Sequence, residues 1–161
     1  IGLIFATVGI TDIFVQGLLL QVLLRKFGES TVAISGLILE IFGYILMASV
    51  VLFASPVPMM LGTIVLAMGD GLLGPSLNGL ISRAAGAEAQ GQVQGGNQSI
   101  QSLAQMIGPF VGGLMYVNIG HASPFLTGVF TALLAIAAIM VALPTIKRAI
   151  ALDEQSAPSP V

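Results

Sequence analysis

The sequence predicts an all-α protein, a bundle of helices that crosses a lipid bilayer several times. Of its 161 residues, 56% are hydrophobic and only 7% are charged, whereas a typical soluble domain has roughly 25% charged residues. The mean hydropathy is +1.02. Five basic and seven acidic side chains are too few to cover the surface of a soluble globule. The composition therefore excludes an ordinary soluble enzyme and indicates a polytopic membrane protein.

The charge balance and the residue inventory exclude several further classes of function. The net charge is −2, and no basic patch is available to meet the phosphates of a nucleic acid. The chain has no cysteine and a single histidine, so it offers neither a thiolate metal site nor a histidine cluster. His121 itself falls in a short polar stretch and is expected to have no functional role. We expect no enzymatic activity and no metal or organic cofactor.

Apolar runs long enough to cross the bilayer recur along the chain. A span needs about 20 apolar residues, because the hydrocarbon core is about 30 Å thick and a helix rises 1.5 Å per residue. The short breaks between the runs favour antiparallel neighbours. Residues 1–148 are expected to form the bundle, and residues 149–161 a disordered cytoplasmic tail. The predicted spans are 1–24, 32–54, 59–82, 93–117 and 125–146.

All the basic residues are predicted to lie on one side of the membrane. They follow the first, third and fifth spans, and the positive-inside rule places those links and the C-terminus in the cytoplasm. These residues are Arg25, Lys26, Arg83, Lys147 and Arg148. An odd number of spans beginning outside, together with Ile1 as first residue, leads us to expect a fragment of a larger, even-numbered bundle.

Three carboxylates fall inside the predicted spans: Asp12, Glu40 and Asp70. Each costs at least ~2.5 kcal/mol to place in the bilayer when ionised. Asp12 and Asp70 lie at equal depth, about 20 Å from the basic ends of their helices, and Glu40 lies about 14 Å deep. An unpaired carboxyl group in such surroundings can bind and release a proton near neutral pH. The alternatives are a protonated packing group, or an acid paired with an arginine elsewhere in the protein.

Amide side chains form a second polar set. Gln16 follows Asp12 by one helical turn, and four glutamines in the fourth span recur on one helix face. Such a stripe does not face lipid, because each amide needs a partner, so it faces either a wet cavity or a neighbouring helix. Gln94 is expected at the membrane interface, and Asn78 is expected to be a packing amide. The expected substrate path comprises Gln16, Gln98, Gln101 and Gln105.

Glycine and proline patterns resemble those of the major facilitator superfamily. Gly108-Pro109-x-x-Gly112-Gly113, preceded by Gly95 and by Ala104 at a glycine position, resembles the antiporter motif of that family. The segment Arg25-Lys26-Phe27-Gly28-Glu29 resembles a degenerate copy of the family's cytoplasmic basic loop motif. Residues 74–83 and 90–95 are similar to the stretch between helices ten and eleven of tetracycline/proton antiporters and related drug exporters.

The resemblance implies a position in the fold and roles for the acids. It makes the chain helices eight to twelve of a twelve-helix transporter, with helices two to six as the alternative. Asp12 falls where the tetracycline exporters carry a coupling histidine, and Glu40 matches an acidic position. Helices eight, ten and eleven of the family contribute more to the cavity than nine and twelve, which favours Asp12 and Asp70 over Glu40 for proton coupling.

The function expected from this resemblance is secondary active transport. The protein would be a multi-pass protein of the inner (plasma) membrane that exports a small molecule in exchange for protons by alternating access. Its partners would be the substrate, protons, the lipid bilayer and the missing N-terminal half of the same transporter. One alternative is a symporter or uniporter for a metabolite or sugar. The other is a structural membrane protein without transport activity.

Overall fold

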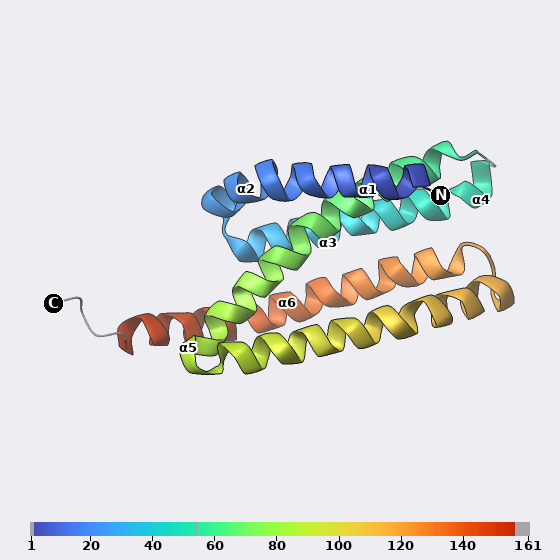
Figure 1. Ribbon diagram of the computed structural model, residues 1–161. Helices are drawn as coiled ribbons and strands as arrows, with labels where there is room; N and C mark the ends of the chain where they lie inside the picture. The colour runs from blue at the N-terminus through green and yellow to red at the C-terminus, as the bar shows by residue number, and fades with distance from the viewer. Residues whose placement is uncertain (1, 54, 157–161) are drawn as a thin grey trace.

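The computed structural model describes residues 2–53 and 55–156, and every element in these ranges is helical (Figure 1). The predicted all-α class is therefore confirmed. In chain order the elements are α1 (Gly2–Phe14), the π-helical η1 (Val15–Leu19), α2 (Leu20–Phe27), α3 (Glu29–Ala48), α4 (Val50–Phe53), α5 (Val57–Asn118) and α6 (Ser123–Ser156).

The first two long rods form a helical hairpin. The segments α1, η1 and α2 follow one another without a break, and α3 runs back beside them (Figure 1). Gly28 makes the turn with φ +76°, a left-handed conformation that glycine adopts without steric cost. Its N–H donates to the carbonyl of Leu24 at 3.0 Å, which closes the last turn of α2.

Helix α5 reverses direction near its middle, although it is helical throughout (Figure 1). A straight helix of 62 residues would be about 93 Å long, three times the hydrocarbon core. Asn97 Nδ2 donates to Asn78 Oδ1 at 2.7 Å across 19 positions, a separation of about 28 Å in a straight helix. Gln90 likewise donates to Ser82. The bend therefore lies between residues 82 and 90. We call residues 57–85 the first limb of α5 and residues 89–118 its second limb.

Helix α6 lies beside the second limb and also reaches α3 (Figure 1). Its helix continues to Ser156, so residues 149–156, predicted as part of a disordered tail, are helical. Residues 157–161 of that predicted tail lie outside the described residues.

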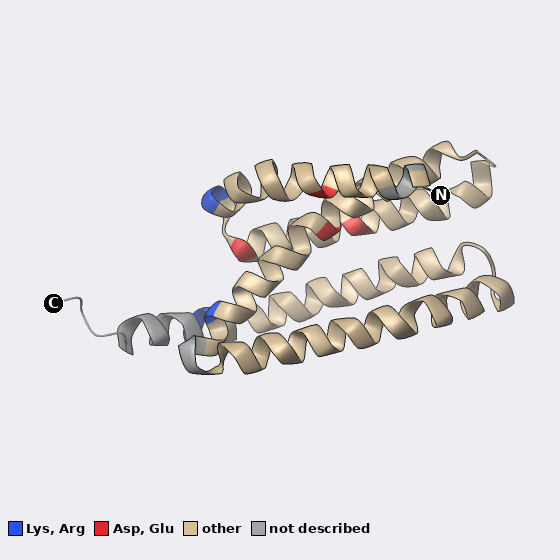
Figure 2. Cartoon of the chain, viewed as in Figure 1, with Lys and Arg blue, Asp and Glu red and all other residues tan. Residues whose placement is uncertain are grey.

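Four helices of the described chain are long and apolar enough to cross a membrane, which confirms a polytopic helical bundle. The fifth predicted span, 93–117, is helical but is not among them, since its amides and glycines lower the mean hydropathy. Figure 2 shows the basic residues at the end of the bundle away from the N-terminus. The four candidate spans are Ala6–Phe27, Glu29–Phe53, Val57–Ala85 and Ser123–Arg148.

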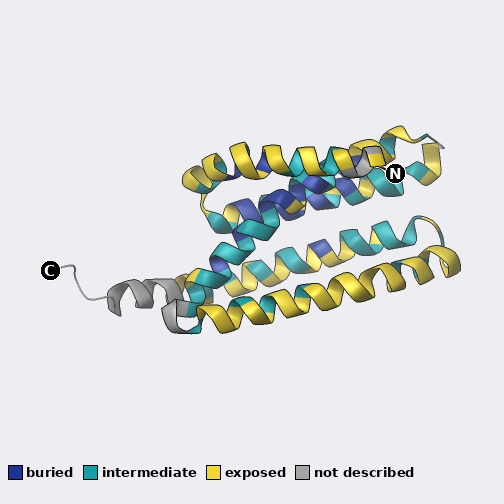
Figure 3. Cartoon of the chain, viewed as in Figure 1, coloured by how far each residue is buried: buried dark blue, intermediate teal, exposed yellow. Residues whose placement is uncertain are grey.

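The tightest packing lies between α3 and the first limb of α5. A methyl group placed on Gly36 would lie 2.8 Å from the carbonyl oxygen of Gly69, and one placed on Gly62 would lie 2.9 Å from that of Gly43. The two backbones therefore touch, as small residues allow in membrane helices. We call these four residues the glycine seam. Burial is concentrated around it, while α6 and the second limb are largely exposed (Figure 3).

Candidate functional site

The glycine seam brings together the three carboxylates that the sequence singled out. A methyl group on Gly69 would lie 2.8 Å from Glu40 Cγ, and one on Gly71 would lie 3.5 Å from Asp12 Oδ1. Asp70 lies between these two glycines on α5. The acidic residues therefore meet from α1, α3 and α5 in the middle of the bundle, as Figure 2 shows.

Two of these carboxyl groups are in direct contact. The side chains of Glu40 and Asp70 form a hydrogen bond with each other. A carboxylate can only accept, so such a bond requires a proton on one of the two groups. Asp12 is close enough to interact electrostatically with Asp70. In the described part of the chain, the one ion pair joins Arg83 to Glu29, so no basic side chain there neutralises the three acids.

The acids differ in their access to the surroundings. Glu40 is buried, with 9% of its surface exposed, Asp12 is half-buried, and Asp70 is exposed. Glu40 was expected to matter less than the other two acids, yet its side chain is the most buried of the three. The reason is its position on the glycine seam, where the backbone of α5 covers it. Glu40 and Asp70 thus connect the interior of the bundle to its surface through one hydrogen bond.

Tyr44, which was not among the predicted site residues, lies beside this cluster. It follows Glu40 by one helical turn on α3. Its ring lies against Gly128 of α6, where an added methyl group would approach it to 2.8 Å. Tyr44 therefore links α6 to the acidic cluster. The i, i+4 spacing from Glu40 is the signal that could have identified it.

Ser76 is a second residue that sequence reasoning missed. It is fully buried, and its hydroxyl has no hydrogen-bond partner among the described residues. Pro75 precedes it and has no N–H to donate to the carbonyl of Gly71, four residues earlier. Two polar groups are thus left without their usual partners within a short stretch of the first limb.

The predicted amide stripe lies on the second limb and takes no part in the acidic cluster's hydrogen bonding. Gln98 and Gln105 are exposed, and Gln94 and Gln101 are half-buried. Gln16 is exposed within η1, where the wider π turn changes its direction relative to Asp12. Asn78 does pack between helical segments as predicted, because it accepts the hydrogen bond from Asn97.

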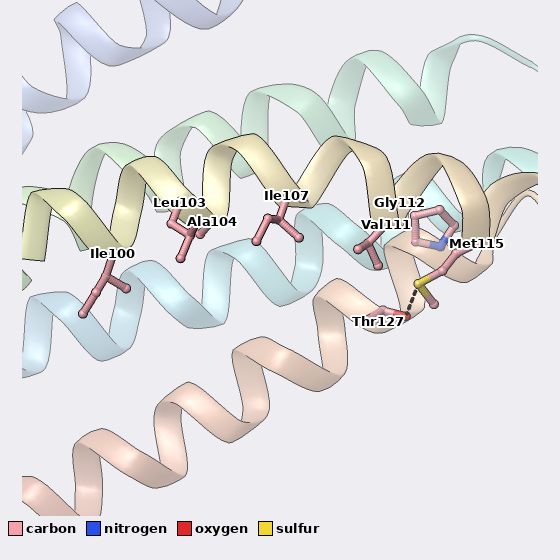
Figure 4. A pocket seen from close by; sticks show the side chains of 10 residues that line it. Ile100, Leu103, Ala104, Ile107, Val111, Gly112, Met115 and Thr127 are labelled. Carbon is pink, nitrogen blue, oxygen red and sulfur yellow. Dashed lines mark hydrogen bonds between the residues drawn. The ribbon is translucent and has the colours of Figure 1, made fainter.

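The antiporter-like motif forms one wall of an apolar groove between the second limb and α6 (Figure 4). The groove has a volume of about 570 Å³ and includes Ala104, Gly108 and Gly112 in its lining. A methyl group on any of Gly95, Gly108, Gly112 or Gly113 would meet nothing within 4 Å. The close packing that such a motif suggests is therefore not made within the described chain, and its glycines leave a smooth, open face.

The loop motif lies at the basic end of the bundle. Arg25 and Lys26 are exposed, Gly28 provides the turn, and the Lys26 ammonium lies 5.3 Å from the centre of the Phe27 ring. Glu29, the last residue of this motif, pairs with Arg83 at 3.2 Å. The motif therefore links the hairpin to the first limb of α5.

A bundle of candidate spans with carboxyl groups in its interior has the construction of a membrane transporter. The chain belongs to the Major Facilitator Superfamily, whose family model matches residues 1–160. This is a family of transporters rather than enzymes, which agrees with the composition and confirms the resemblance at the level of the family.

Three curated proteins that the chain resembles are tetracycline resistance proteins. The chain is 31% identical to the class C protein of Escherichia coli over 69% of its own length, and 33% identical to the class E protein of Escherichia coli over 72%. The class H protein of Pasteurella multocida is 28% identical over 72%. The matches cover 27–28% of the relatives' length. No solved structure matches the chain significantly.

Proposed function

We propose that this chain is the part of a proton-coupled small-molecule exporter that carries the proton-binding carboxyl groups. The hydrogen bond between Glu40 and Asp70 carries the proposal. It holds one proton between two helices, inside an apolar bundle, and Asp12 stands beside it. The sequence positions of the acids, the family and the relatives all support this role.

The proposed coupling follows from charge repulsion. When the shared proton leaves, two adjacent carboxylates face each other in a medium of low dielectric, and their repulsion favours separation of α3 from α5. The glycine seam presents smooth backbone surfaces that can shift against each other, and the stretch around Pro75 and Ser76 can bend. Proton binding and substrate binding would then favour opposite conformations of the transporter, as exchange by alternating access requires.

The substrate class is proposed from the relatives and the polar residues. The relatives are named for tetracycline resistance, which supports export of drug-sized molecules. Asp12, at the position where the resemblance expects a histidine, favours a substrate with cationic or hydrogen-donating groups. Gln16, Gln98, Gln101 and Gln105 would line the path, since amides bind such groups without adding charge. The N-terminal half of the transporter would complete the cavity.

The proposed membrane arrangement is that of helices eight to twelve. Residues 93–117 would be the remaining span, because the second limb returns across the bundle beside α6. The basic end would face the cytoplasm, and with it the C-terminus, by the positive-inside rule. The protein would lie in the plasma membrane.

The proposal is tested in the full-length transporter that contains this chain. Uptake of a fluorescent cationic drug into inverted vesicles would be measured with an imposed pH gradient, and substrate exchange would be measured without one. Asp70→Asn combined with Glu40→Gln should abolish uphill uptake while exchange continues, because exchange needs the cavity but not the proton. Uphill uptake at the parental rate would overturn the proposal.

A further inference from the structure

A small pocket lies at the basic end of the bundle, apart from the acidic cluster. Its volume is about 300 Å³, and its lining consists of Leu24, Arg25, Gly28, Glu29 and Arg83. Along α5, Arg83 is about 20 Å from Asp70. Nothing in the proposed coupling mechanism uses this pocket.

The turn at Gly28 and the ion pair with α5 build the pocket. The left-handed glycine returns the chain at once into α3, so that Arg25 and Glu29 line the same hollow. The Glu29 carboxylate is 3.2 Å from Arg83 Nε and lies over Gly79, where an added methyl group would approach Oε1 to 2.8 Å. Glu29 is therefore held in place by a close backbone surface and a cation.

The two arginines retain unused hydrogen-bond donors. The ion pair with Glu29 engages Nε of Arg83, and no described residue pairs with its terminal amino groups or with the guanidinium of Arg25. Two guanidinium groups and one carboxylate leave the pocket with a net positive charge. An arginine fork binds two oxygens of a phosphate group at once, which an ammonium group cannot do.

The depth of the pocket indicates which phosphate it would meet. Arg25 and Arg83 each directly follow the apolar run of a predicted span, 1–24 and 59–82 respectively. Both are therefore at the boundary between hydrocarbon and water, where lipid phosphates lie. Leu24 adds an apolar wall on the bilayer side of Arg25. Basic pockets between membrane helices bind the head groups of anionic lipids.

We propose that this pocket binds the phosphate group of an anionic phospholipid, held by the guanidinium groups of Arg25 and Arg83. Glu29 sets the strength of binding, because its carboxylate competes with the phosphate for Arg83. Free phosphate has the same chemistry, but it would gain nothing from the boundary position or from Leu24.

The test uses native mass spectrometry of the full-length transporter, equilibrated with phosphatidylglycerol or phosphatidylcholine. High salt, about 0.5 M ammonium acetate, screens general surface attraction. Arg25→Gln with Arg83→Gln should reduce retained phosphatidylglycerol about tenfold more than the control pair, Lys26→Gln with Lys147→Gln. The control pair removes the same charge from the same end of the bundle without touching the pocket. Equal losses in the two pairs would overturn the proposal.

Two further variants keep the test decisive if the glutamine pair does not fold. Arg25→Lys with Arg83→Lys keeps the charge but loses the fork, and should retain less phosphatidylglycerol than the parent. Glu29→Gln should retain more, because Arg83 is released to the phosphate. A loss of retention in Glu29→Gln, or unchanged retention in the lysine pair, would contradict the proposed geometry.

The source of the phosphate is settled by competition. Inorganic phosphate at millimolar concentration should leave the retained phosphatidylglycerol unchanged. Displacement of the lipid by inorganic phosphate would identify a free-anion site, and equal retention of phosphatidylcholine would show that the pocket does not select anionic lipids. Either result would overturn the lipid assignment.

Discussion

Glu40 of α3 and Asp70 of α5 share a hydrogen bond across the glycine seam. One partner is buried and the other is exposed, so a single proton position joins the interior of the bundle to its surface. This relationship makes α3, expected from the family resemblance to be a peripheral helix, part of the proposed coupling site.

The first prediction concerns single substitutions of the two acids in this pair. Glu40→Gln and Asp70→Asn, each alone, should reduce proton-driven uptake at least about tenfold, since either change ends the exchange of the shared proton. Asp12→Asn should reduce it too if Asp12 helps to expel the proton by charge repulsion. Uphill uptake and gradient-free exchange in inverted vesicles measure the two activities. If exchange fails together with uptake, the acids are packing groups.

The second prediction concerns the glycine seam. Gly36→Ala should destabilise the bundle by about 1–3 kcal/mol, because the new methyl group would meet the Gly69 carbonyl oxygen at 2.8 Å and force the helices apart. Gly74→Ala is the matched control, since an added methyl group there meets nothing within 4 Å. Thermal unfolding in detergent measures both. Equal melting temperatures of the two variants would show that the backbones of α3 and α5 are not in close contact at Gly36.

The third prediction concerns the buried hydroxyl of Ser76. Ser76→Ala should leave stability unchanged or raise it by up to about 1 kcal/mol, because the variant no longer buries an unpaired polar group. Ser35→Ala is the contrasting change. It should not raise stability in the same way, since the Ser35 hydroxyl donates to the Val32 carbonyl at 2.7 Å. Thermal unfolding compares the two. A clear loss of stability in Ser76→Ala would mean that the hydroxyl is paired in the membrane.

The fourth prediction concerns the apolar groove. Gly112→Leu places a large side chain in the groove between the second limb and α6. In the full-length transporter it should impair transport without preventing insertion, if another helix packs on this face. Gly96→Leu, on the same limb outside the groove lining, is the control. Transport at the parental rate in Gly112→Leu would show that the antiporter-like motif has no role in helix packing or movement.

The fifth prediction concerns orientation. The chain contains no cysteine, so single cysteines can be introduced cleanly. Cysteines at Ser30, Ala87 and Ser156 should be shielded from impermeant thiol reagents in intact cells, whereas those at Val57 and Ala122 should react. If the first set reacted and the second set were shielded, the proposed orientation would be wrong.

The sequence by itself determined the class of the protein and the positions of its long apolar helices. Hydropathy is a local property, and a long apolar run has few alternatives to a membrane helix. The equal depths predicted for Asp12 and Asp70 follow from the fixed rise of a helix, and in the structure the three acids lie near one another. The family resemblance likewise depended on short, local motifs around Gly28 and Gly108.

Only the tertiary structure decided which of these groups touch. The π turn η1 lies inside the first predicted span, and α5 stays helical across the predicted break between spans 59–82 and 93–117. Rotation of each helix about its axis, set by the contacts at Gly36, Gly43, Gly62 and Gly69, decides that Glu40 meets Asp70 and that Tyr44 meets Gly128. Such rotations depend on packing between distant segments, which one-dimensional periodicity does not contain.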